Sequence, residues 1–151
     1  MFMRYFMSAV IALSGLAASA QITASKAFIS APSDVFPLFD TNTRMDMVDY
    51  YNSGLSTPSA NRMDGRSSVT DMSPQSLTVK ISESSSAQLA ILTAGSDTLI
   101  AVVSTVAAPG LDSTVKFYDK GWTPLQGGRY FTAPEWKDWV TPGHDTSEIT
   151  A

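Results

Sequence analysis

The chain has 151 residues, no cysteine and a formal net charge of −4 at pH 7. The absence of cysteine excludes disulfides, thiolate nucleophiles, cysteine-based zinc sites and a lipid-modified cysteine. The mildly acidic balance, without a cluster of Lys or Arg, argues against binding to nucleic acid or to an anionic membrane surface. Composition alone therefore removes several classes of function and names none.

The first twenty residues have the pattern of a secretory signal peptide. Arg4 gives a positive start, residues 5–16 form a short apolar run, and Ala18-Ser19-Ala20 is a small-x-small cleavage site. The run is shorter than the ~20 residues that a membrane span needs. We therefore expect cleavage near Ala20-Gln21, a periplasmic or extracellular protein, and no stable membrane anchor after cleavage.

The rest of the chain predicts one domain between two polar segments. Residues 21–31 indicate a flexible leader, residues 32–140 a single α+β domain, and residues 141–151 a polar tail. At the start of the domain, residues 32–39 predict a short helical turn. This turn would bring three apolar side chains into the core, namely Phe36, Leu38 and Phe39.

A short helix is predicted over about residues 44–53. Thr43 and Asp46 form a capping-box-like pair at its start, and Gly54 stands where a left-handed C-terminal cap belongs. Its apolar face consists of Met47, Val48 and Tyr51.

Two aspartates in this helix, Asp46 and Asp49, stand three residues apart beside Arg44. Acids near a helix start are favoured by the helix dipole, so a structural role accounts for both. A catalytic pair would need one carboxyl group kept protonated by its surroundings. Arg44 opposes the dipole, and we expect it to form a structural salt bridge with an acid elsewhere. Arg44, Asp46, Asp49 and Gly54 are therefore assigned structural roles.

From Leu77 onwards the hydrophobic period changes to two, which indicates β-strands. Short turns separate four predicted strands, near residues 77–82, 87–91, 98–106 and 113–119, and a further short strand is predicted around residues 67–70. The strand over 98–106 is apolar on both faces, as expected for a central strand covered on both sides. The predicted fold is α+β, with short N-terminal helices packed on a four- or five-stranded antiparallel β-meander.

Seven aromatic residues fall within the 23 residues from Phe117 to Trp139. A capping pattern from Thr132 to Glu135 predicts a short helix in this region. Tyr and Trp rings can stack on sugars or anchor a protein partner, and they can equally close a core. Both interpretations stay open, and the candidate binding contacts are Tyr118, Trp122, Trp136 and Trp139.

No pattern in the sequence predicts a catalytic, metal or cofactor site. His144 is the sole histidine and lies in the polar tail. The stretch Asp40-x-Asn42-x-Arg44 fails as a calcium loop, because Arg44 and Met45 stand where an oxygen ligand and a glycine belong. Nucleophile-elbow, P-loop and dinucleotide motifs are absent from the sequence. We assign no catalytic residue, no metal ligand and no cofactor.

A set of residues occurs in the same order as in a known family. The set comprises Asn42, Arg44, Asp46, Met47, Asp49, Tyr50, Gly54, Glu83-Ser84-Ser85, Asp97-Thr98, Thr105-Val106, Asp112-Ser113, Phe117-Tyr118 and Trp122-x-Pro124-Leu125. On these residues, the chain resembles a secreted Bacteroidales family catalogued as domain of unknown function 3256, over about residues 32–139. The resemblance implies a periplasmic or secreted bacterial protein and brings no activity. It also implies that members continue with more sheet-forming sequence, so a truncated reading frame is an alternative to a complete chain.

Three functions stay open on this basis. The leading one is a non-catalytic binding or interaction module of the cell envelope, whose partner is an envelope glycan or an envelope protein. The second is a carboxylate-dependent hydrolase of envelope or dietary glycans, because glycoside hydrolysis needs only two suitably separated acids. Those acids would come from Asp46, Asp49, Glu83, Asp97 and Asp112. The third is a structural subunit of an envelope assembly.

Overall fold

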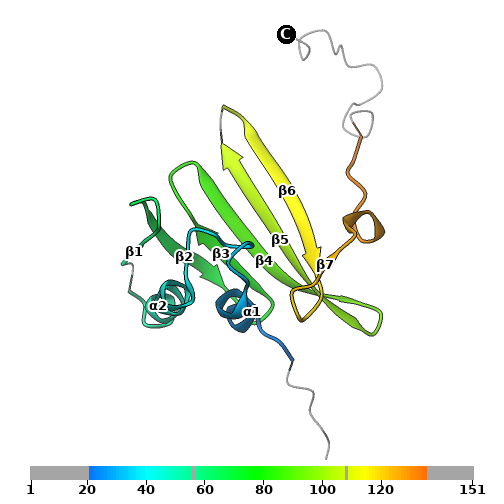
Figure 1. Ribbon diagram of the computed structural model, residues 1–151, viewed down its shortest axis with the longest axis horizontal. Coiled ribbons are helices and arrows are strands. Elements are labelled where there is room, and N and C mark those ends of the chain that lie inside the picture. The colour runs from blue at the N-terminus through cyan, green and yellow to red at the C-terminus, as the bar shows by residue number, and fades with distance from the viewer. Residues whose placement is uncertain (1–20, 56, 108, 136–151) are drawn as a thin grey trace, which may run out of the picture.

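Antiparallel strands form one seven-stranded sheet whose spatial order follows the chain (Figure 1). The computed structural model describes residues 21–55, 57–107 and 109–135. Its strands are β1 (Ser59–Ala60), β2 (Arg66–Met72), β3 (Ser76–Lys80), β4 (Ser85–Ala94), β5 (Asp97–Ala107), β6 (Leu111–Tyr118) and β7 (Pro124–Leu125). The predicted α+β class and antiparallel meander are confirmed, and the sheet has more strands than the four or five predicted.

The strands beyond the five predicted are the shortest ones, and the strand predicted around residues 67–70 is present as the longer β2. β1 and β7 have two residues each. In β2, Ser67 is buried and its hydroxyl donates a 2.8 Å hydrogen bond to the carbonyl oxygen of Ile81. A buried serine of this kind interrupts the apolar alternation by which a strand is recognised in a sequence.

The central strand β5 is buried on both faces, as the sequence predicts. Ile100 and Val102 belong to the main core, and the alternation of side chains puts Leu99 and Ala101 on the opposite face. On that opposite face, called the back face below, Phe117 stands across from Ala101 and packs on the Tyr130 ring at a centroid distance of 5.6 Å. Tyr130 follows the 3-10 turn η1 (Gly127–Arg129).

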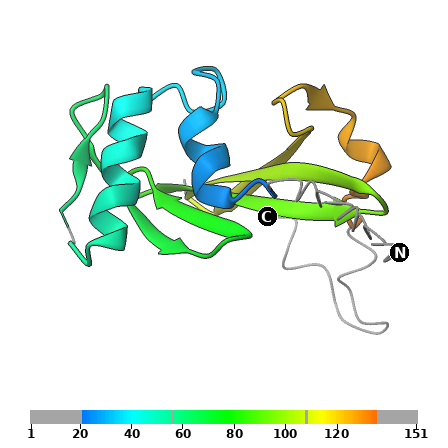
Figure 2. The ribbon, with the colours of Figure 1, turned by 90° about the horizontal axis from the view of Figure 1, so that it is seen from below.

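Two helices, α1 (Ala24–Ser30) and α2 (Thr41–Asn52), cover the other face of the sheet. Figure 2 shows both on the same side of the strands, and Figure 1 shows them over the β1 to β4 half. The main core lies between these helices and the sheet. Its fully buried larger side chains include Phe28, Phe39, Met47, Leu77, Leu89 and Ile100.

The prediction that residues 21–31 form a flexible leader is wrong. These residues contain α1, in which Ala24, Ala27 and Phe28 are completely buried. The Thr23 side chain caps the helix start, and the Ala24 N–H donates a 2.9 Å hydrogen bond to the Pro74 carbonyl oxygen. Two alanines and one phenylalanine make an apolar face too small to stand out among the polar neighbours in the sequence.

Residues 32–39 form the turns that the sequence predicts. The Val35 N–H donates to the Pro32 carbonyl, and the Phe39 N–H donates to the Phe36 carbonyl. Phe36 and Phe39 are buried, and the Phe28 and Phe36 rings meet edge-on at 5.1 Å. This turn therefore closes one end of the core.

The predicted helix over 44–53 is present as α2, and it begins earlier. Its N-cap is Asp40, whose carboxylate accepts a 2.8 Å hydrogen bond from the Thr43 N–H, so the predicted cap at Thr43 is wrong. Gly54 follows the helix with φ +67°, as predicted. The N–H groups of Gly54 and Leu55 donate to the Tyr51 and Tyr50 carbonyls, which completes a Schellman cap.

Other predictions fall partly or wholly beyond the described residues. Residues 131–135 have no regular secondary structure, so the predicted helix does not begin there. Trp136, Trp139, His144, the signal peptide and the polar tail lie outside the described residues. Among the described helices, none is long and apolar enough to cross a membrane.

Candidate functional site

Arg44 is almost completely buried, with 2% of its surface exposed. Its guanidinium donates hydrogen bonds to three backbone carbonyl oxygens, of Ala31 (2.7 Å), Ile29 (3.2 Å) and Phe39 (3.2 Å). Within the described residues no carboxylate forms an ion pair with it, so the predicted salt bridge is wrong. Arg44 instead ties α2 to the end of α1 and to the turn that joins the two helices.

The predicted acids do not come together on one site. Asp46 and Asp49 are both exposed on α2. Glu83 lies in the turn before β4, and Asp97 begins β5 at the opposite end of the β4–β5 pair. Asp112 lies opposite Val106 in the β5–β6 pair. The described residues therefore show no convergence of these carboxylates around one cavity.

The two described aromatic candidates belong to the core. Tyr118 and Trp122 are 7% and 8% exposed, and their ring centroids are 5.2 Å apart. The Trp122 indole N–H also donates a 3.4 Å hydrogen bond to the Ser30 hydroxyl of α1. Of the two interpretations left open by the sequence, the burial of Tyr118 and Trp122 favours a role in the core.

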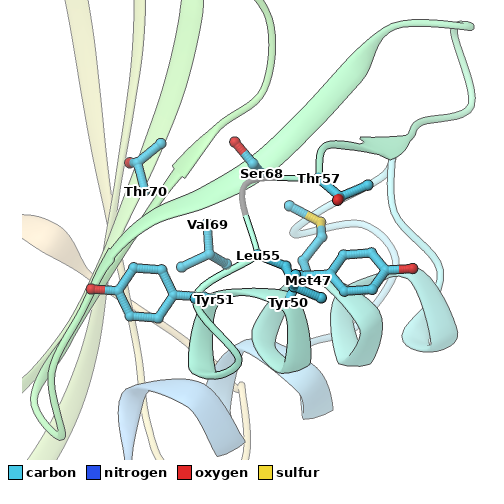
Figure 3. A pocket seen from close by; sticks show the side chains of 9 residues that line it. Met47, Tyr50, Tyr51, Leu55, Thr57, Ser68, Val69 and Thr70 are labelled. Atoms are coloured by element: carbon cyan, nitrogen blue, oxygen red, sulfur yellow. The ribbon is translucent and has the colours of Figure 1, made fainter.

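A hollow of about 350 Å³ opens between the C-terminal half of α2 and strand β2. Figure 3 shows the Tyr50 and Tyr51 rings extending in opposite directions along it, with Met47, Leu55 and Val69 between them. Its remaining lining residues are Gly54, Thr57, Ser68 and Thr70. We call this feature the α2–β2 hollow, and it is the candidate site.

Local backbone geometry produces the α2–β2 hollow. The left-handed conformation of Gly54 ends α2 and turns the chain so that Leu55 lines the hollow instead of continuing the helix. On the other wall, the β2–β3 register shifts between Val69 and Asp71, a bulge at Thr70. Bulges bend a strand and redirect a side chain, and they are common beside binding sites.

The chemistry of the α2–β2 hollow is uncharged. Met47 and Val69 are buried at its base, and Tyr50 and Tyr51 are half-buried. No Asp, Glu, Lys, Arg or His is among its described lining residues. The site can therefore offer aromatic faces and hydroxyl groups, and it offers no acid, base or metal ligand. Across the described residues, no cluster of three or more His, Asp or Glu could hold a metal ion.

Residues 16–151 match the family described as "Protein of unknown function (DUF3256)". The chain belongs to this family. The resemblance predicted from the sequence is thereby confirmed. Among curated proteins, no sequence matches the chain.

The fold of this DUF3256 protein also occurs in a solved structure, a domain of an uncharacterized protein from Porphyromonas gingivalis W83. The two share 24% sequence identity with a TM-score of 0.66, over 80% of this chain. The chain spans 62% of the length of that domain. The similarity establishes a shared fold.

Sequence reasoning did not predict the α2–β2 hollow of this DUF3256 protein. Tyr51 was assigned to the apolar face of the helix, where it does pack partly against the core. The available signal is the adjacent pair Tyr50-Tyr51, because neighbouring helix residues are about 100° apart around the axis, so Tyr50 extends the aromatic surface past the core-facing side. The wall formed by Ser68, Val69 and Thr70 has no sequence signal, since it depends on the bulge in β2.

Proposed function

We propose that this DUF3256 protein is a secreted, non-catalytic binding module of a bacterial cell envelope. Its ligand is a glycan, and an uncharged part of that glycan occupies the α2–β2 hollow. The observation that carries the proposal is the uncharged lining of the hollow, which includes two tyrosine rings and Thr57.

The size and lining of the α2–β2 hollow fit a sugar unit. Ligand pockets usually enclose roughly 300–1,000 Å³. The hollow, at about 350 Å³, stands at the small end of that range. A tyrosine face packs on the C–H surface of a sugar ring, while the hydroxyl groups of Thr57 and of the two tyrosines can exchange hydrogen bonds with those of the sugar.

Binding is favoured over hydrolysis by the position of the acids. Glycoside hydrolysis uses two carboxyl groups on either side of the scissile bond. The described lining of the α2–β2 hollow contains no carboxylate. Asp46 and Asp49 lie on the same helix but are exposed and line no part of the hollow.

Secretion is supported by the sequence. Arg4, the apolar run over 5–16 and the Ala18-Ser19-Ala20 site together have the pattern of a signal peptide. A glycan of the envelope would then be the polymer that the protein meets on leaving the cytoplasm. The absence of cysteine is consistent with a compartment in which the fold does not rely on disulfides.

The test is to titrate the protein with neutral and charged envelope oligosaccharides and to monitor binding by tyrosine fluorescence or by NMR amide chemical shifts. Neutral sugars should shift amides of α2 and β2 around the hollow. Replacing Tyr50 with Ala should weaken binding about two- to tenfold, since an aromatic contact contributes roughly 0.5–1.5 kcal/mol. Y50F should retain most of the affinity if ring stacking dominates.

The matched control is Leu92→Ala, which removes an exposed apolar side chain from β4. This variant should bind as the wild type does. Unchanged spectra across the whole oligosaccharide panel would refute the glycan proposal. Amide shifts caused only by envelope peptides would replace the glycan with a protein partner.

A further inference from the structure

The outer edge of β6 is mostly unpaired within the described residues. Its inner edge pairs with β5 along the whole length from Leu111 to Tyr118. On its outer edge, β7 pairs only with Phe117 and Tyr118. Figure 1 shows β7 as a short segment beside one end of β6, with the rest of β6 at the margin of the sheet.

Hydrogen bonds on both sides reveal which backbone groups of β6 point outward. The Asp119 N–H donates to the Thr123 carbonyl on the β7 side. The backbone N–H and C=O groups of odd-numbered residues in β6 therefore point away from β5. The Ala107 N–H donates to the Ser84 carbonyl, so the backbone groups of odd-numbered residues in β5 point toward β4. The even-numbered residues of β5 therefore hydrogen-bond to the even-numbered residues of β6 that stand opposite them. The N–H and C=O groups of Leu111, Ser113 and Val115 therefore face away from the sheet.

Two features along this edge complement each other. Leu111 is 80% exposed, the highest value among the large apolar side chains of the described residues. Four residues further along β6, beside β7, is a hollow of about 250 Å³. Its lining residues are Val115, Lys116, Phe117, Tyr118, Pro124, Leu125 and Gly127. An exposed leucine and a hollow with several apolar side chains in its lining thus stand along one strand edge.

We propose that β6 is a self-association surface, on which a second copy of this chain pairs antiparallel with β6 about a two-fold axis at Ser113. Leu111 of each copy then stands opposite Val115 of the other, and its side chain enters the hollow beside Phe117 and Leu125. Ser113 stands opposite its own counterpart. The outward groups of residues 111, 113 and 115 in the two copies complete the backbone hydrogen bonds.

Charge supports a second copy over an unrelated strand. Asp112 and Lys116 are exposed on the face opposite to that of Leu111, and charged residues on an edge strand discourage indiscriminate pairing. In the two-fold arrangement Lys116 lies diagonal to Asp112 of the other copy, within reach of a long side chain. The same patch meets itself, as in an isologous dimer. An edge this short buries less than a standard interface, so the dimer is weak and concentration-dependent.

The first experiment is sedimentation velocity of the secreted chain over about a hundredfold range of concentration, where a weak dimer shows mass action. The wild type should shift from monomer to dimer. Leu111→Lys should weaken association about tenfold or more, since it removes a buried leucine from each side. Ser113→Pro should abolish it while leaving the β5–β6 ladder intact, because its lost N–H points outward. Ser113→Thr keeps that N–H and should associate normally.

Cysteine cross-linking supplies an independent test. The chain has no cysteine, so Ser113→Cys can form only an intermolecular disulfide. Paired Cα atoms at a hydrogen-bonded position are about 5.5 Å apart, which a disulfide spans. Ser113→Cys should therefore oxidise rapidly to a dimer, and Ser104→Cys on the interior strand β5 should not. The proposal would be overturned if the wild type sediments as a monomer at every concentration. It would also be overturned if Leu111→Lys and Ser113→Pro dimerise as strongly as the wild type.

Discussion

The guanidinium of Arg44 donates a 2.7 Å hydrogen bond to the carbonyl oxygen of Ala31, the residue that ends α1. Ala31 is itself buried, so this carbonyl has no access to bulk water. A side chain from α2 therefore supplies the donor that the last turn of α1 lacks within its own helix. The relationship holds together the two helices that cover the sheet, and it does so without a carboxylate partner.

Replacing Arg44 with Gln should destabilise the fold by about 3 kcal/mol, because it leaves the Ala31, Ile29 and Phe39 carbonyls without their charged donor. Thermal unfolding followed by circular dichroism should show a melting temperature lower by roughly 10 °C. Arg44→Lys should recover only part of this loss, since an ammonium cannot reproduce the planar fork of the guanidinium.

Arg62→Gln is the matched control for Arg44. Arg62 is exposed, and its guanidinium donates a long 3.4 Å hydrogen bond to the Pro37 carbonyl. Its removal should leave the melting temperature nearly unchanged. Equal losses in the two variants would contradict the role given to the buried carbonyl network.

Asp40 should make α2 sensitive to acid. The Thr43 N–H hydrogen bond lowers the pKa of the Asp40 carboxyl below its ordinary value. A pKa lowered in the folded state contributes stability that is complete above the unfolded-state pKa of about 4 and is lost as the pH falls through the folded value. In urea unfolding at a series of pH values, the stability gap between wild type and Asp40→Asn should narrow below about pH 4. A gap that is constant between pH 7 and pH 2 would show that Asp40 is not the titrating cap.

Gly54→Ala should destabilise the protein by about 1 kcal/mol, because φ is +67° there and a β-carbon is strained in that region. A β-carbon at Gly54 would meet no atom within 4 Å, so the cost is conformational and not a clash. Gly110→Ala is the control, since a β-carbon there also meets open space and the backbone is not left-handed. Urea unfolding measures the free energy of unfolding of both variants. Equal values for the two variants would refute the backbone strain at Gly54.

Trp122→Ala should cost about 3–5 kcal/mol, the usual loss for a buried large aromatic side chain. Its ring packs on Tyr118, and its indole N–H reaches Ser30 of α1. Trp122→Phe should cost less because it keeps most of the packing. Chemical denaturation measures both losses. If Trp122→Ala unfolds like the wild type but loses ligand, the side chain is a binding contact after all.

Patterns over several turns or strands were readable from the sequence. The strands from Leu77 to Tyr118, the helix around Met47 and its cap at Gly54 are each determined by local periodicity or by a local backbone requirement. The family resemblance and the exclusion of cysteine chemistry likewise need no structure. These features follow from neighbouring residues, so the order of the chain is enough to predict them.

Only the tertiary structure decided which partners distant residues acquire. The Arg44 guanidinium donates hydrogen bonds to carbonyls thirteen and fifteen residues away in the sequence. The short apolar face of α1 becomes buried when the sheet forms beneath it. The Trp122 indole N–H donates to the Ser30 hydroxyl, 92 residues away. The α2–β2 hollow likewise arises where a helix cap and a strand bulge happen to face each other. Burial and hydrogen bonding between separated segments depend on how the folded backbone places these segments next to each other. No local sequence pattern predicts that placement.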